Sequence, residues 1–209
     1  MQITKYGHSC LHVVDGTGSV LIDPGVFSEG WESLSGLTGV LITHAHADHL
    51  DTGRLGALVA ANADLPVYAD PGAAGALADA GVAATAVTAG TTLDLGLPVE
   101  VGGEWHAVVH EDIPRITNVS YRLAGRLFHP GDSLRVPDEP VEILALPVMA
   151  PWMAVKEAID YFRAVSPQVA IPIHEKLLAN TGMVYGILQG LGPADARWLD
   201  LDSGEPATV

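Results

Sequence analysis

Four side chains of the types that bind metal ions follow the apolar run Val40–Thr43 within six consecutive residues: His44, His46, Asp48 and His49. His44 and His46 are two residues apart, so in an extended segment both imidazoles point the same way, as two ligands of one ion must. Asp48 and His49 are adjacent and diverge, which suits a second ion beside the first. An HxH pair alone is often only part of a surface loop or core, but four such residues after one strand predict a metal site.

Two ions need more ligands than one loop supplies, and other candidates follow later predicted strands. His110 ends the segment Trp105–Val109, Asp132 lies in a turn after Leu127-Phe128, and His174 follows Ile171-Pro172-Ile173. The edge of a sheet would deliver all three side chains into one cleft.

The third histidine has a competitor, because His106 lies four residues before His110. Alternation along a strand places both on the same face and does not choose between them. His106 would lie inside the predicted strand, about 13 Å before His110 at roughly 3.3 Å per residue, whereas His110 is the last residue before a polar loop. We therefore expect His110 to bind the first ion, and His106 to affect packing or substrate fit.

Short apolar runs that end at Gly, Asp or Pro predict strands, and helical spacing with capping residues predicts helices. Asp51-Thr52 begins one helix, and Asp70 with Pro71 at the first helical position begins another. The predicted strands are Ile3–Tyr6, Cys10–Val14, Val20–Ile22, Val40–Thr43, Val67–Ala69, Thr91–Leu95, Val99–Val101, Trp105–Val109, Val119–Leu123, Arg126–Phe128, Ile143–Leu146 and Val169–Ile171. The predicted helices are 52–61, 73–80, 153–165 and 184–191.

The order of these elements predicts the fold class. Two strand-rich blocks, each followed by helices, predict an α/β fold in which two sheets pack face to face with helices outside, a four-layer αββα sandwich. No repeat, charge block or low-complexity linker divides the chain, so residues 1–209 are expected to form a single domain. The metal site is expected at the rim of the two sheets.

Composition limits the class of protein, the partners and the compartment that can be expected. Hydrophobic residues make up 48% of the chain and charged residues 17%, which is typical of a globular protein. The net charge of −15 disfavours nucleic acid and anionic membranes as partners and favours a small-molecule substrate. One cysteine and an N-terminus without a long apolar segment favour a reducing compartment, so we expect the cytoplasm. The oligomeric state stays open, a homo-oligomer included.

The motif His44–His49 and the residues that follow it resemble the metallo-β-lactamase fold superfamily of hydrolases over nearly the whole chain. Leu21-Ile22-Asp23-Pro24, His110, Gly131-Asp132 and His174 repeat that family's motif order. The opening Ile3–Cys10 and the closing Ile171–His174 are most similar to the ascorbate-6-phosphate lactonase-like branch.

The resemblance implies a role for each matching position. The first ion is expected to be bound by His44, His46 and His110, and the second by Asp48, His49 and His174. Asp132 would bridge the two ions, and Asp23 would orient the histidine-rich loop. The expected cofactors are two divalent ions, with Zn as the first choice and Mn or Fe as alternatives.

The resemblance also implies a reaction. Two ions about 3.5 to 4 Å apart activate a bridging water, and Asp48 and Asp132 are the expected catalytic residues that handle its proton. Cys10 precedes the motif and is the single cysteine, whereas true β-lactamases of the commonest zinc class have a cysteine ligand, so antibiotic hydrolysis is not expected. The expected activity is hydrolysis of a small ester, lactone or phosphodiester, with an anionic substrate as one option. An iron-dependent oxidoreductase and a metal-bound binding protein without turnover are the alternatives.

Several residues near the expected ligands carry weaker hypotheses. Arg115 and Lys176 could hold an anionic group of the substrate, although a solvated surface charge is the simpler interpretation for each. Trp152 could line the pocket or only pack. The remaining candidates are Phe27 and Trp31 for a flap, and His8, His12 and His129 for the core or for supporting the ligands.

Overall fold

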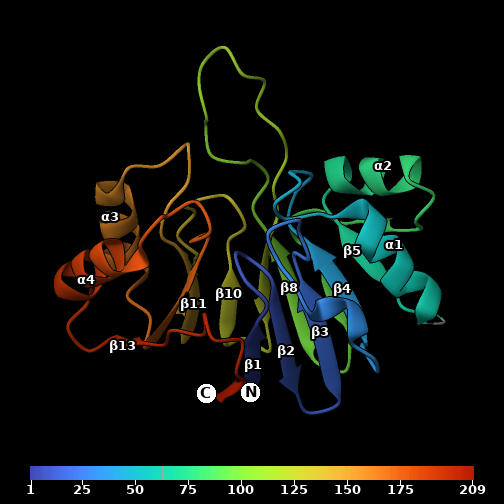
Figure 1. The fold of residues 1–209 in the computed structure, drawn as a ribbon, viewed down its shortest axis with the longest axis horizontal. Coiled ribbons are helices and arrows are strands. Elements are labelled where there is room, and N and C mark those ends of the chain that lie inside the picture. The colour runs from blue at the N-terminus through green and yellow to red at the C-terminus, as the bar shows by residue number, and fades with distance from the viewer. Residues whose placement is uncertain (63) are drawn as a thin grey trace.

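The protein is a sandwich of two β-sheets between two pairs of helices, seen edge-on in Figure 1. The computed structural model describes residues 1–62 and 64–209, and within them each sheet has seven strands. Helices α1 (Thr52–Ala61) and α2 (Pro71–Asp79) cover one sheet, and α3 (Val155–Val165) and α4 (Thr181–Leu191) cover the other. The predicted αββα architecture is confirmed.

The first sheet has the strand order β14-β1-β2-β3-β4-β5-β6. Its strands β1 to β3 form an antiparallel meander, and β3 to β6 are parallel. The bounds are β1 (Gln2–Lys5), β2 (Leu11–Asp15), β3 (Gly18–Ile22), β4 (Gly39–Ile42), β5 (Val67–Ala69), β6 (Thr85–Ala86) and β14 (Ala207–Thr208), with a 3-10 helix η1 (Trp31–Ser33) between β3 and β4.

The second sheet has the strand order β13-β12-β11-β10-β9-β8-β7. Strands β7 to β10 are antiparallel and β10 to β13 are parallel. The bounds are β7 (Thr92–Asp94), β8 (Pro98–Gly102), β9 (Ser120–Leu123), β10 (Leu127–His129), β11 (Ile143–Pro147), β12 (Val169–Ile173) and β13 (Arg197–Trp198).

Burial on both faces explains the apolar character of the central strands. Every residue of β11 and β12 is buried, because one face packs on the opposite sheet and the other on helices α3 and α4. Between the sheets, Leu11 and Ile22 of the first sheet belong to the same core as Tyr121 and Ile171 of the second.

The two predicted helix starts are confirmed by their hydrogen bonds. The Asp51 side chain accepts a hydrogen bond from the backbone N–H of Arg54 at 3.0 Å. The Asp70 side chain accepts from the N–H groups of Gly72 and Ala73, and Pro71 is the first helical residue. Each carboxylate satisfies amides that have no partner within the helix, which is why these positions begin helices.

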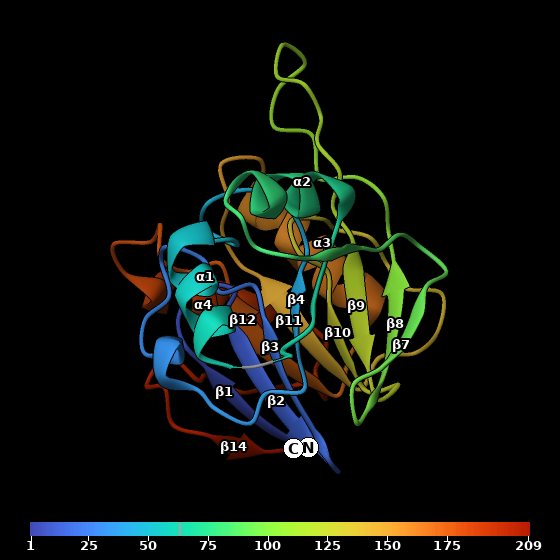
Figure 2. The same ribbon diagram turned by 90° about the vertical axis from the view of Figure 1, so that its right-hand side faces the viewer.

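The predicted strand Trp105–Val109 is wrong. Strand β8 ends at Gly102, and residues 104–118 form a loop that projects from the end of the sandwich, with one isolated bridge between Trp105 and Thr117 (Figure 2). Trp105 is 44% exposed and Val108 58% exposed, so this apolar run packs in neither sheet. An apolar run becomes a strand only where a layer covers it.

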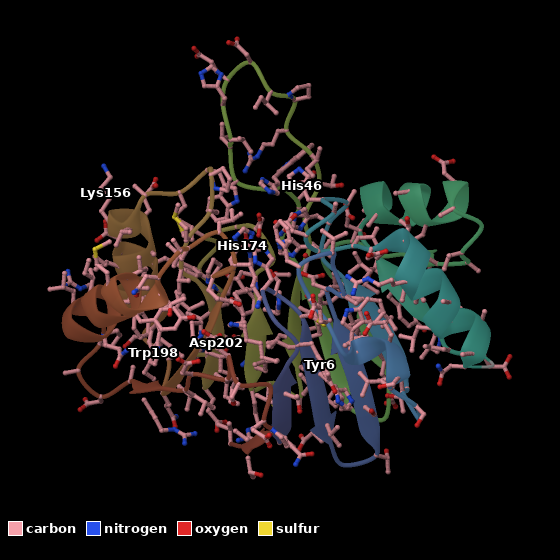
Figure 3. All side chains as sticks on the ribbon, viewed as in Figure 1. Tyr6, His46, Lys156, His174, Trp198 and Asp202 are labelled. Atoms are coloured by element: carbon pink, nitrogen blue, oxygen red, sulfur yellow. The ribbon has the colours of Figure 1, made fainter. Side chains whose placement is uncertain are left out.

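The strand directions bring six chain segments to one edge of the sandwich. Strands β1, β3 and β4 point the same way in the first sheet, and β8, β10 and β12 do so in the second. The loops after these strands contain His8, Asp23, the His44–His49 segment, His106, Asp132 and His174. His46 and His174 lie near the base of the projecting loop in Figure 3.

Candidate metal centre

Asp23 holds the histidine-rich loop from the end of β3. Its carboxylate accepts hydrogen bonds from the backbone N–H of Thr43 at 2.7 Å and from the Thr43 hydroxyl at 2.6 Å. The same carboxylate lies 2.7 Å from Nδ1 of His49. Because Nδ1 donates to Asp23, the Nε2 atom of His49 is left to face Asp132, 3.0 Å away.

A first group of ligand-type side chains consists of His44, His46, His106 and Asp132. One nitrogen or oxygen atom of each lies within 4.8 Å of those of the others. The imidazole rings of His44 and His46 are 4.9 Å apart between centroids, and that of His106 is 4.7 Å from His46. Four such atoms in so small a volume match the ligand number of a tetrahedral zinc site.

A second group consists of His8, Asp48, His49 and His174, whose ligand-type atoms also lie within 4.8 Å of one another. Oδ2 of Asp48 lies 3.1 Å from Nε2 of His8 and 3.4 Å from Nε2 of His174. Asp48 is the only one of the four that keeps substantial exposure, 21% of its side chain, so the group opens to solvent at this carboxylate.

Asp132 lies between the two groups. Its Oδ1 is 3.0 Å from Nε2 of His49 and 3.3 Å from Nε2 of His174, both in the second group. Its Oδ2 is 3.3 Å from Nε2 of His106 in the first group. One carboxylate therefore presents one oxygen to each group.

Three neighbours fix the orientation of Asp132. Nε1 of Trp152 donates to Oδ2 at 2.8 Å, and the backbone N–H of Asp132 donates to the side-chain oxygen of Asn118 at 2.9 Å. Gly131 before it has φ +60, and a Cβ there would lie 2.3 Å from that Asn118 oxygen and 2.7 Å from Cβ of Thr43. Only glycine lets the turn approach the histidine-rich loop this closely.

The expectation for His110 is corrected by the structure, which brings His106 to the first group instead. His110 lies in the projecting loop with its side chain 59% exposed, and its contacts are with Asp112. The physical reason is that β8 ends at Gly102, so His106 stands at the base of the loop and His110 further out. The Arg115 side chain stabilises the base of the projecting loop, because its Nε donates a hydrogen bond to the carbonyl of His106 at 2.5 Å.

His8 belongs to the second group although the sequence suggested only a core or supporting role. It follows Gly7 after β1, and both residues have left-handed φ values, +98 for Gly7 and +52 for His8. The available signal was a histidine next to a glycine just after an apolar strand. His12 and His129 belong to neither group: Nε2 of His12 lies 2.9 Å from the Ser19 hydroxyl, and His129 is buried.

Burial and mutual contacts set the charges of this centre. Burial alone would raise the pKa of Asp48 and of Asp132. Contacts with His174 and His8 instead hold the pKa of Asp48 well below the usual carboxyl range. The pKa of Asp132 is likewise held well below that range, above all by His49. Burial lowers the pKa of His44 and His46, and lowers that of His8 to about 4. Ionised carboxylates and neutral imidazoles are the forms that bind metal.

Two histidines behave in the opposite way. Burial would lower the pKa of His174, but Asp132 and Asp48 outweigh it and raise the pKa to about 9. Asp132 and Asp23 likewise raise the pKa of His49 against the effect of burial. In the metal-free protein these carboxylates attract protons onto the two rings, so a cation bound at the centre has to displace protons.

The donor set fits metal ions. Within residues 1–62 and 64–209, five buried polar atoms of the two groups have no hydrogen-bond partner: Nδ1 of His8, Oδ1 of Asp132 and Nε2 of His44, His106 and His174. A buried polar atom without a partner is costly. Three of these atoms, Nε2 of His44, His106 and His174, lie 4.0, 3.3 and 3.3 Å from a carboxylate oxygen of Asp132. Nitrogen and carboxylate oxygen are ligands that divalent transition metals favour.

The residues with weaker hypotheses flank this centre in different ways. Trp152 contacts Asp132 directly, as described above. Arg115 lines a cavity with Trp105, Ser133 and Arg135, and its guanidinium lies 5.8 Å from the centroid of the Trp105 ring.

Lys176 lines a second cavity with Tyr6 and Phe27, and the Phe27 ring lies 5.3 Å from that of His8. Trp31 is fully buried and packs in the core under α1, so the hypothesis that it forms part of a flap is wrong.

Comparison with known proteins agrees with the fold and the centre. Residues 2–174 match the family described as the β-lactamase superfamily domain. Protein Rv0786c of Mycobacterium tuberculosis is 44% identical over 211 residues, which cover 97% of this chain and 98% of that protein. A UPF0173 metal-dependent hydrolase of Deinococcus radiodurans is 30% identical over 204 residues, covering 83% of this chain and 84% of the relative. The chain belongs to the metallo-β-lactamase superfamily.

A solved structure shows the same fold. Igni18, described as a novel metallo hydrolase from Ignicoccus hospitalis, superimposes with a TM-score of 0.75 at 19% identity, covering 100% of this chain and 97% of the other. In the part of the chain that the structure describes, no helix is both long and apolar enough to cross a membrane.

Proposed function

We propose that this protein is a metal-dependent hydrolase that uses two divalent ions. The observation that carries the proposal is Asp132, whose two oxygens face two separate groups of ligand-type atoms. The first ion would be held by His44, His46 and His106, and the second by Asp48, His49 and His174, with His8 beside them. The metal-dependent hydrolases among its relatives support the class of enzyme.

Two bound divalent ions would supply a water of lowered pKa between them and would polarise the scissile carbonyl or phosphoryl group. The chain itself supplies the handling of protons. Asp48 is partly exposed and its Oδ2 faces the second group, so we assign this carboxylate the role of accepting the proton of the attacking water on the ground of its position. Asp132 is buried and held by Trp152, which suits a bridging ligand that can also assist proton transfer.

The proposed substrate is a small ester, lactone or phosphodiester with an anionic group. Its support is that Arg115 and Arg135 line a cavity beside Ser133, the neighbour of Asp132, and that Lys176 lines one beside Phe27. The first cavity has two arginines against Glu104, whereas the second has Lys176 beside Glu29. The net positive lining therefore lies at the Arg115 cavity, and in a chain of net charge −15 with only 10 basic residues it favours an anionic group there. The ascorbate-6-phosphate lactonase-like branch, whose members the N-terminal residues resemble, fits this substrate class.

The test begins with protein purified without chelator and reconstituted with Zn or Mn. We expect about two ions per chain by elemental analysis, and turnover of at least one compound in panels of lactones, carboxylic esters and phosphodiesters. Asp132→Asn keeps the shape but removes the charge, so it should lose an ion and nearly all turnover, whereas Asp112→Asn in the exposed loop is the matched control and should lose neither.

Three outcomes would overturn parts of the proposal. One ion or none per chain after reconstitution contradicts the two-ion centre. Two ions with no turnover across all three panels contradicts the hydrolase. An iron-dependent visible absorption together with oxygen consumption assigns the centre to the oxidoreductase alternative, because histidine and carboxylate ligands also suit iron.

A further inference from the structure

A lysine ammonium group is buried next to the second group of ligands. Lys5, the last residue of β1, has no exposed side-chain surface. Its Nζ lies 2.7 Å from Oε2 of Glu175 and 2.5 Å from Oδ1 of Asp202. The hydroxyl of Tyr185 on α4 donates to the other oxygen of Asp202 at 2.9 Å. Four charged or polar side chains from both ends of the chain thus form one connected network.

The network ends on the backbone of the second group. Oε1 of Glu175 accepts a hydrogen bond from the backbone N–H of His8 at 2.9 Å, while its Oε2 is held by Lys5. The backbone N–H of His174 in turn donates to the carbonyl of His8 at 3.2 Å. One carboxylate therefore connects the Lys5 ammonium to the turn that carries His8 and to the strand end that carries His174.

Both histidines need such support because of their backbone conformation. His8 has φ +52 and His174 has φ +68, in the left-handed region that is unfavourable for residues other than glycine. A residue persists in such a conformation only when its surroundings impose it. The hydrogen bond that Glu175 accepts from the His8 N–H and the one that the His174 N–H donates to the His8 carbonyl restrain the two backbones here.

The network includes residues beyond the part of the chain that matches the superfamily domain. That match ends at residue 174, whereas Glu175, Tyr185 and Asp202 follow it. Asp202 lies well below His174 in the view of Figure 3, and the interactions of Lys5 span the distance between them. A buried charge is expensive to desolvate, so a network of this kind is better explained by the geometry that it imposes than by net stability.

We propose that Lys5, through Glu175, is a positioning residue for the second metal site: it fixes the backbone of His8 and His174, and so the placement of their imidazoles relative to Asp48. The inference rests on the proposed two-ion function. Lys5 itself touches neither ligand atoms nor substrate. Removing it should weaken the second site and leave the first, because His44, His46 and His106 make no hydrogen bond or ion pair to the network within the described residues.

The experiment measures binding of Co²⁺ to the two sites by competition with a chelator and by visible absorption. Lys5→Met is expected to raise the Kd for the second Co²⁺ by 10- to 100-fold, the usual effect of removing a partner that orients a ligand. The Kd and spectrum of the first Co²⁺ should not change. Lys5→Met leaves Glu175 and Asp202 without their cation, and Lys5→Met/Glu175→Gln removes the more buried of these two carboxylates, so it should recover part of the thermal stability while the second site stays weak.

Arg126→Met is the matched control. It removes a cation from another ion pair, with Glu142 at 2.6 Å, whose contacts do not reach the centre. This variant should bind both Co²⁺ ions as the unmodified protein does. If Lys5→Met does not fold, Tyr185→Phe loosens only Asp202 and should weaken the second site in the same direction.

Several results would overturn the proposal. A double variant with unchanged second-site affinity assigns Lys5 a purely structural role, and an equal loss in Arg126→Met assigns the effect to general destabilisation. If Lys5→Met is unfolded, an unchanged Kd for the second Co²⁺ in Tyr185→Phe contradicts the proposed positioning role of Lys5. Failure of the two-ion function itself is distinguishable, because the unmodified protein would then bind only one Co²⁺.

Discussion

Replacing His106 and His110 one at a time tests the central assignment of the first metal site. His106→Ala removes one of four ligand-type atoms in the first group. Structural zinc sites with four ligands contribute about 10–16 kcal/mol, so one ligand accounts for about 3 kcal/mol, or about 150-fold in Kd. At a free metal concentration above both Kd values, the metal then stabilises the folded state by about 3 kcal/mol less, which lowers Tm by about 6–12 °C.

His110→Ala should have almost no effect. Its side chain is 59% exposed, and among the described residues its hydrogen bond and ion pair are both with Asp112, whose carboxylate is 3.5 Å away and itself exposed. Substitutions at such positions change stability by about 0.5 kcal/mol or less. The metal count and the metal-dependent part of Tm should match those of the unmodified protein.

The assay is elemental analysis of each purified variant together with thermal unfolding, with and without chelator. For His106→Ala, Tm should fall in the metal-loaded state, while the chelated variant should unfold close to the chelated unmodified protein. The structural assignment would be refuted if His110→Ala lost an ion while His106→Ala kept both. That result would mean that His110 binds the first ion, as the strand pattern predicts.

Three further predictions concern the surroundings of the ligands. His174 has a folded pKa of about 9, above its unfolded value near 6.5, so its contacts with Asp132 and Asp48 stabilise the metal-free protein by about 3 kcal/mol below pH 6.5. This stabilisation is lost as pH rises through 9, and metal affinity should rise over the same range because the ring loses its proton. Urea unfolding of the chelated protein and metal competition, each at about pH 6 and about pH 9.5, would show both changes. Trp152→Phe removes the 2.8 Å hydrogen bond to Asp132 and should weaken metal binding by about 10- to 100-fold with the fold retained. An unchanged metal affinity in this variant would contradict an orienting role for Trp152. Cys10→Ser places a hydroxyl in an apolar core, so it should lower the free energy of unfolding, measured by chemical denaturation, by about 1–3 kcal/mol with both ions retained. Loss of an ion from the folded variant would mean that the ligand set is wrong.

Local sequence was enough for the features that depend on neighbouring residues. The helix starts at Asp51 and Asp70 could be predicted because a side chain caps amides two or three residues away. The histidine-rich loop after β4 could be predicted because its ligand-type residues are close in sequence. The layers followed from the order of apolar strands and amphipathic helices, since each pattern must bury one face.

Only the tertiary structure decided between His106 and His110, because an apolar segment becomes a strand only if another layer covers it, and Trp105, Val108 and Val109 stay exposed. It also brought His8 to Asp48 across 40 positions of sequence and Trp152 to Asp132 across 20. The network of Lys5 with Glu175 and Asp202 joins residues 170 and 197 positions apart. Contacts at such separations depend on how the two sheets pack and which way their strands run, and no pattern within one segment records that.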